Sequence, residues 1–365
     1  MTEPATVVGA LDRRLAARLA GGAVELTEPL AAAARRHRTH LLLAASLSPE
    51  ERATAIGNQL ARELTIAAAL NAWRDEETRR LLAALSHDGI DVLVMKGSAL
   101  AHTLYAEPHL RPRLDVDLLL GRDALERAER VVTAEGWTHP VERAAEVAEP
   151  QRHYVKDGPG GSLYHLDVHW RIAIPQAFGD ALSFHELAQR SVPVPQLGAS
   201  ARTLSPVDAL LLACVHRVAH HADAIDLLWL RDIHLLVEHL TAEERVELPA
   251  RAQRASIVAV TRRGLALAAD LFGTPHAAEL LSGLAALPPQ SESSADFLGG
   301  VRPVNALRLD LAALTWSARL ALVAEHLFPA PAYMRARYPS VPPVLLPAAY
   351  VYRILSGAPR WFKRP

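Results

Sequence analysis

Two aspartates, Asp115 and Asp117, stand inside the apolar run LDVDLLL at residues 114–120. Residues two apart on a strand point to the same face. The run therefore predicts a strand with both carboxylates on one face and the alternate residues, beginning with Leu114, toward the core. Adjacent carboxylates repel each other, so an otherwise apolar strand needs a compensating cation. Mg²⁺ is the usual cation, because it takes oxygen ligands and keeps waters that a phosphate can replace. The alternative is an edge strand whose acidic face is solvated.

A third aspartate, Asp167, lies in a second predicted strand over residues 163–174. This strand forms a hairpin with residues 153–156 across the Gly-rich turn at 157–161. The alternation places apolar side chains on one face and polar ones on the other; the polar side chains are those of His165, Asp167, His169 and Arg171. We expect the two strands to be neighbours, so that the three carboxylates lie near a common point.

A third strand, residues 91–95, ends at Lys96-Gly97-Ser98, where a short helix over 98–105 begins. Glycine lets the backbone approach a ligand closely, and a helix N-terminus offers free N–H groups to a phosphate. The sequence is not a P-loop, and Gly-Ser by itself is a common turn.

The rest of the chain has mostly helical periodicity. We predict helices over residues 27–47, 50–86, 123–135, 206–221, 225–240, 250–272 and 305–327. The predicted fold class is α+β: a small mixed sheet core at residues 88–200, flanked by helical regions at 1–87 and 201–365.

Net charge and cysteine content limit the expected partners and cellular location. A net charge of −1 and the absence of a basic, aromatic stripe count against nucleic acid as a partner. Cys214 is the single cysteine, and neither a signal peptide nor an apolar run long enough to cross a membrane is evident. These features favour a cytoplasmic protein without a transmembrane segment. The basic and aromatic residues at 352–364 indicate a frayed helical tail or a contact with a membrane surface or partner.

Several of these motifs occur together in one known family. The order MKGSAL at 95–100, Tyr105, Arg111 and DVDLL at 115–119 resembles an uncharacterised bacterial nucleotidyltransferase family of the polymerase-β-like superfamily. DVHWR at 167–171 is similar to its DLHWR strand. The helical part, with Leu204-Ser205-Pro206, His216, His220 and WLRDI at 229–233, is also similar, so the resemblance covers roughly residues 60–240.

The resemblance implies a metal-dependent transfer of a nucleoside monophosphate. Asp115 and Asp117 would hold two Mg²⁺ ions, and Asp167 would ligate the second and help to activate an acceptor hydroxyl. Gly97 and Ser98 would hold the β- and γ-phosphates of a nucleoside triphosphate, with ATP the expected donor. Three basic side chains are the candidates to neutralise the phosphates: Lys96, Arg111 and Arg113.

Three histidines on one predicted helix, His216, His220 and His221, allow two interpretations. An i, i+4 pair can bind zinc, but neither an H-E-x-x-H motif nor a cysteine pair accompanies it. We favour a role for His216 and His220, with His169, in lining the acceptor site.

The acceptor is a hydroxyl or phosphate group of a small molecule, a natural-product intermediate, a peptide or a protein. The alternative function is a catalytically silent binding module that keeps the fold and recruits a partner.

Overall fold

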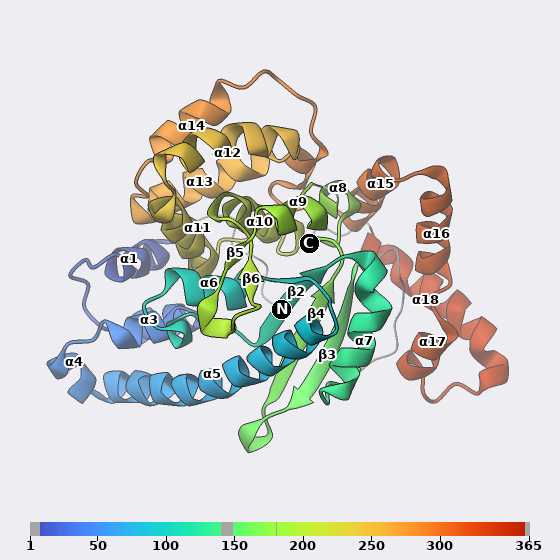
Figure 1. Cartoon of the computed structure of the whole chain (residues 1–365), viewed down its shortest axis with the longest axis horizontal. Coiled ribbons are helices and arrows are strands. Elements are labelled where there is room, and N and C mark those ends of the chain that lie inside the picture. The colour runs from blue at the N-terminus through green and yellow to red at the C-terminus, as the bar shows by residue number, and fades with distance from the viewer. Residues whose placement is uncertain (1–7, 140–148, 180, 362–365) are drawn as a thin grey trace.

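The computed structural model describes residues 8–139, 149–179 and 181–361, and it confirms the α+β class (Figure 1). A single six-stranded mixed sheet lies among the helices, in the order β3-β4-β2-β1-β6-β5. The strands are β1 Val92–Met95, β2 Asp115–Leu120, β3 Gln151–Asp157, β4 Leu163–His169, β5 Val192–Pro193 and β6 Arg202–Thr203. How the chain divides into domains stays a prediction.

Helices make up most of the remaining chain. They are α1 Ala10–Leu19, α2 Glu28–Arg36, α3 His40–Ala45, α4 Pro49–Ala53, α5 Ala55–His87, α6 Lys96–Leu104, α7 Leu125–Ala134, α8 Gln176–Gly179, α9 Phe184–Gln189, α10 Pro206–Ala219, α11 Leu227–His239, α12 Ala242–Arg254, α13 Val258–Phe272, α14 Ala277–Ala285, α15 Pro303–Ala313, α16 Trp316–Leu327, α17 Pro331–Arg337 and α18 Leu346–Trp361. Within the described residues, none of them has both the length and the hydropathy of a membrane-spanning helix. Residues 362–365 of the predicted tail lie outside the described residues.

Four predicted helices are each two helices in the structure. The chain turns between α2 and α3 at Arg38, and between α12 and α13 at Ser256, both with positive φ. Thr54 ends α4 and caps α5 by accepting a hydrogen bond from the Gly57 amide, and Leu314 and Thr315 separate α15 from α16. Hydrophobic periodicity continues across such breaks of one to three residues, so it does not reveal them.

The centre of the sheet confirms that the two aspartate-bearing strands are neighbours. β2 pairs with β4 in parallel, and Asp117 lies opposite Asp167 in the register. β1 runs antiparallel to β2 on the other side, with Met95 opposite Asp117. The C-terminal end of β1, the N-terminal half of β2 and the middle of β4 therefore meet at one place in the sheet.

One face of the sheet is apolar and closed. Val116 and Leu118 of β2 and Leu166 of β4 are buried there against the C-terminal half of α5 and against α7. The prediction that Leu114 joins this core is wrong: its side chain is 69% exposed, because the strand begins one residue later at Asp115. The second predicted strand is likewise shorter than expected and ends at His169.

The opposite face carries the aspartates. Leu93, Met95 and Leu119 of this face belong to a second core cluster with residues of α1–α3 and α10–α14. Helices α6, α10 and α11 lie beside the sheet, and α5 runs towards the sheet from its N-terminal half, which lies below α3 (Figure 1). The polar part of this face therefore borders helices that precede and helices that follow the strands in the chain.

Candidate active site

Three carboxylates from two neighbouring strands lie on one face of the sheet. Asp115 and Asp117 differ by two positions on β2, and Asp167 stands opposite Asp117 on β4. The ligand atoms of Asp117, Asp167 and His169 lie within 4.8 Å of one another. In the described part of the chain this is the only group of at least three histidine, cysteine or acidic side chains with that spacing. Two oxygen donors and one imidazole at this separation suit a divalent cation.

Asp115 is the carboxyl whose ionisation the site opposes. Burial is the largest cause, and together with the negative charges of Asp117 and Asp167 it raises the pKa of Asp115 to about 6. The positive charge of Lys96 offsets only part of this effect. A carboxylate held in this way is a group that a metal ion would stabilise.

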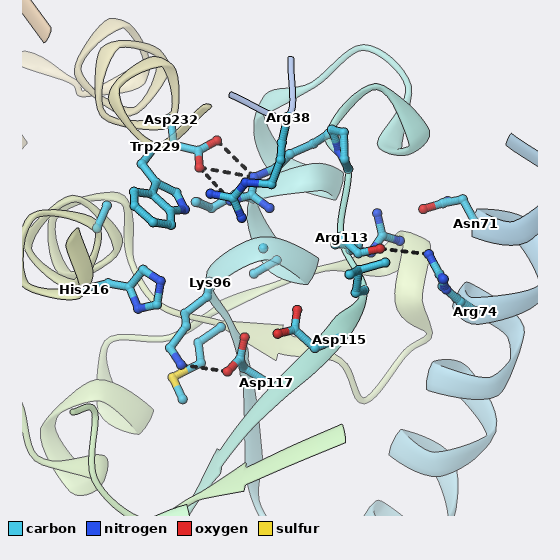
Figure 2. A pocket seen from close by; sticks show the side chains of 18 of the residues that line it. Arg38, Asn71, Arg74, Lys96, Arg113, Asp115, Asp117, His216, Trp229 and Asp232 are labelled. Atoms are coloured by element: carbon cyan, nitrogen blue, oxygen red, sulfur yellow. Dashed lines mark hydrogen bonds and ion pairs between the residues drawn. The ribbon is translucent and has the colours of Figure 1, made fainter. Parts of the chain in front are cut away.

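Asp117 has the opposite electrostatic setting. Burial acts to raise its pKa, but Lys96 and His169 outweigh burial and hold the pKa of Asp117 well below its ordinary value. Lys96 Nζ lies 2.7 Å and His169 Nε2 lies 2.9 Å from Asp117 Oδ1 (Figure 2). Burial, followed by the charge of Lys96, lowers the pKa of His169, so the ring is neutral near pH 7. Asp117 thus has a resident cation in Lys96.

Lys96 reaches this position from a strained backbone. It is the first residue of α6 and has a φ of 53°, a left-handed conformation that residues other than glycine seldom adopt. Such strain persists only where the surrounding structure enforces it, and it is frequent at functional sites. Lys96 lies beside the Asp117 carboxylate, and its contact with a phosphate stays a prediction.

Gly97 and Ser98 make contacts within the protein. A Cβ atom on Gly97 would lie 2.6 Å from Arg111 Nη1, so glycine allows the arginine to pass close to the start of α6. The Ser98 hydroxyl donates to the carbonyl oxygen of Asp115 at 3.0 Å. Both residues therefore fix the β1–α6 junction against the loop and strand that carry the other site residues.

Arg111 pairs with an aspartate far along the chain. Its Nε donates to Asp232 Oδ1 at 3.0 Å and its Nη2 to Asp232 Oδ2 at 2.6 Å. The Tyr105 hydroxyl donates to the same carboxylate at 2.7 Å. Burial acts to lower the pKa of Arg111, yet the Asp232 carboxylate raises it above its ordinary value. This bidentate ion pair connects the loop before β2 to α11.

Arg113 connects the same loop to α5. Its Nη2 pairs with Asp75 of α5, which also accepts from Asn71 Nδ2 at 2.7 Å and contacts His102 Nε2 at 3.1 Å. Neither Arg111 nor Arg113 pairs with Asp115 or Asp117 in the described structure. Their positive charges are already compensated.

A cavity of about 810 Å³ opens over the carboxylates. Its lining comes from α3, α5, the β1–α6 junction, β2, β4, α10 and α11. Asp115, Asp117 and Asp167 all border it. Figure 2 shows Asp115 between the wall that carries Lys96, His216 and Trp229 and the wall that carries Asn71 and Arg74. A cavity of this volume accommodates a nucleotide with room for a second group.

The histidines of α10 and the turn after it line one wall as neutral rings. Burial lowers the pKa of His220 to about 3 and of His221 to about 4, and it lowers that of His216 well below its ordinary value. His216 and His221 bring their Nε2 atoms to 3.2 Å, and His221 lies 4.1 Å from the Trp229 ring between centroids. These rings offer hydrogen bonds and an aromatic surface without positive charge. His169 is buried against Asp117.

Sequence reasoning missed several lining residues. Arg38 stands 4.6 Å from the centroid of Trp229, and Asn71 and Arg74 come from a helix that was predicted from its periodicity alone. Asp232 lies in the WLRDI segment, which drew attention only as part of a resemblance. A polar side chain in an amphipathic helix looks solvent-exposed until the tertiary structure places a pocket next to it.

The chain matches the model of one protein family. The model of a family described as uncharacterised nucleotidyltransferase matches residues 26–273, which is more than half of the chain and includes all the lining residues. Helices α14 to α18 lie after the matched residues. No curated protein matches the sequence.

Proposed function

Because the chain belongs to the family of uncharacterised nucleotidyltransferases and is thus an enzyme that transfers nucleotidyl groups, we propose that it moves AMP from ATP to an acceptor hydroxyl or phosphate. The reaction would depend on Mg²⁺ and follow the polymerase-β-like pattern. The observation that carries this proposal is that three aspartates, from two neighbouring strands, line the base of a nucleotide-sized cavity.

The close spacing of the Asp117 and Asp167 carboxylates supports a divalent metal. Asp115, Asp117 and Asp167 are the proposed ligands, and the ammonium group of Lys96 at Asp117 marks a position where the site already holds positive charge. When bound, Mg²⁺ supplies electrostatic stabilisation of the triphosphate and of the charge that develops during transfer. Displacement of Lys96 from Asp117 would free its ammonium group for a phosphate oxygen.

The proposed reaction is a substitution at the α-phosphorus of ATP. The acceptor oxygen forms a new bond to this phosphorus, and the bond to the bridging oxygen breaks, so that pyrophosphate leaves with the electron pair. Asp167 is the proposed group that takes the acceptor proton, because it borders the cavity and lies opposite Asp117. His153 Nδ1 contacts Asp167 Oδ1 at 2.8 Å and fixes the position of the carboxylate.

The two substrates are proposed to occupy different parts of the cavity. The phosphates lie near Lys96 and the start of α6, where Gly97 and Ser98 form the junction. Arg111 and Arg113 shape this region through their pairs with Asp232 and Asp75. The neutral His216 and His220 line the proposed acceptor side.

Incubation with each labelled nucleoside triphosphate, Mg²⁺ and cell lysate tests the proposal. We expect label from ATP to enter an acceptor, and the label to be lost with a chelator or in Asp167→Asn. Incorporation that needs no divalent cation, or that survives this substitution, contradicts the proposed mechanism. Absence of label with every nucleotide, under conditions where the protein is folded, favours a silent binding module.

A further inference from the structure

The charges of the pocket are paired unevenly. Five basic side chains line the cavity: Arg38, Arg74, Lys96, Arg111 and Arg113. Four of these have a carboxylate partner, namely Asp226, Asp117, Asp232 and Asp75 for Arg38, Lys96, Arg111 and Arg113 respectively. Throughout the described residues, no carboxylate forms an ion pair with Arg74.

Arg74 is held in place by neutral contacts. Its Nη1 donates to the carbonyl oxygen of Arg113 at 2.8 Å, and its guanidinium carbon lies 5.7 Å from the centre of the Tyr164 ring. The Nε atom is buried without a hydrogen-bond partner. No described residue accepts a hydrogen bond from Nη2. The guanidinium is therefore positioned while part of its donor capacity is free.

A half-buried cation without a counter-ion is unfavourable by itself. Burial lowers the pKa of Arg74, and the neighbouring charge of Arg113 acts in the same direction. Asp115 attracts the guanidinium, but no direct pair forms, and a metal ion on Asp115 would remove that attraction. An anionic ligand in the cavity would supply the missing counter-charge.

We propose that Arg74 of α5 binds a phosphate group of the nucleotide in this cavity. The inference rests on the proposed function and adds a binding residue to it. Arg74 and Lys96 lie on opposite sides of Asp115 (Figure 2), so that together they place positive charge on both sides of the carboxylates. A guanidinium suits the role because its planar N–H groups match phosphate oxygens and its charge persists at every physiological pH.

Arg74 differs in burial and ion pairing from Arg111 and Arg113, the two arginines of the motif. Arg111 and Arg113 are more deeply buried, and each would have to give up a carboxylate in order to bind a phosphate. Arg74 gives up no ion pair when it binds. The nucleotide therefore contacts α5, a helix that precedes the first strand of the sheet.

Calorimetry on the full-length protein tests this with three probes: Mg·ATP, Mg·tripolyphosphate and adenosine. Arg74→Gln should weaken the binding of both phosphate ligands about 10- to 100-fold, the effect of one lost hydrogen bond to a charged group, and leave adenosine affinity unchanged. Arg74→Lys keeps the charge, so its affinity for the two phosphate ligands should lie between that of the wild type and that of Arg74→Gln. Arg80→Gln is the matched control, because Arg80 lies on the same helix but outside the cavity, and it should bind every probe like the wild type.

Three results overturn the inference. Wild-type affinity of Arg74→Gln for Mg·ATP excludes a nucleotide contact, and if transfer is then slower, the anion that Arg74 binds belongs to the acceptor. An equal loss for adenosine and the phosphate ligands indicates a general change of the pocket. A wild-type protein that binds none of the probes refutes the proposed function itself, a result distinguishable from the first two because no substitution is involved.

Discussion

Asp115→Asn should make the metal-free protein more stable near neutral pH. The carboxylate is mostly buried beside two other acids, and its pKa is raised from 3.8 to about 6. At about 1.4 kcal/mol per pH unit, this corresponds to at most about 3 kcal/mol of unfolding free energy lost when Asp115 ionises. Asparagine keeps the shape and removes the charge, so the substitution should recover part of that free energy.

The difference in stability between Asp115→Asn and the wild type depends on pH. The folded protein holds the Asp115 proton more tightly than the unfolded chain, so the penalty is absent below the unfolded pKa of 3.8 and complete above about pH 6. The difference between Asp115→Asn and the wild type should therefore be close to zero at about pH 4 and largest at about pH 8.

Asp117→Asn provides the matched comparison, because it is the same change two residues away on the same strand. Asp117 is stabilised by Lys96 and His169, and its pKa lies below the ordinary value. Removal of one partner from such a buried pair costs about 3–5 kcal/mol. The wild-type contribution is complete above the ordinary pKa of the carboxyl and is lost at lower pH, so this variant should be less stable than the wild type near neutrality.

Urea unfolding followed by circular dichroism, in buffer with a chelator, measures both differences. Addition of Mg²⁺ should then stabilise the wild type more than Asp115→Asn, because the metal ion compensates a charge that the variant lacks. If both variants shift stability in the same direction at about pH 8, or if Asp115→Asn is destabilised there, the described electrostatics of the site are wrong.

Three further predictions concern the pocket. Calorimetry should show that ATP binds much more weakly with a chelator than with Mg²⁺, because its phosphates would face three carboxylates; equal affinities would contradict a metal-bridged triphosphate. Asp232→Asn should lower the free energy of unfolding by about 3–5 kcal/mol, since Arg111 is buried and loses its counter-charge, and a melting temperature like that of the wild type would show that the pair is dispensable. Gly97→Ala should cost about 1–3 kcal/mol in urea unfolding, because the new methyl group meets an Arg111 side chain that Asp232 holds in place; an unchanged midpoint would mean that the arginine moves freely.

Much of the local structure followed from the sequence. Alternation along residues 114–120 and 163–174 was enough to place Asp115 and Asp117 together and Asp167 on the polar face of its strand, because a strand has a fixed period of two. The start of β2 was not predictable in this way, and Leu114 lies outside the core as a result. The breaks at Arg38 and Ser256 were hidden for a similar reason, since a single left-handed residue leaves the hydrophobic pattern on either side intact.

The sequence determined which chemical groups share a face, because that depends on backbone geometry over a few residues. Which charges are paired depends on the tertiary structure. Arg111 meets Asp232 across 121 positions and Arg113 meets Asp75 across 38, so the two arginines suggested by the motif are compensated, while Arg74 in a long helix is not. Ion pairing and burial depend on distances between segments far apart in the chain, and hydrophobic periodicity reports only on neighbours along it.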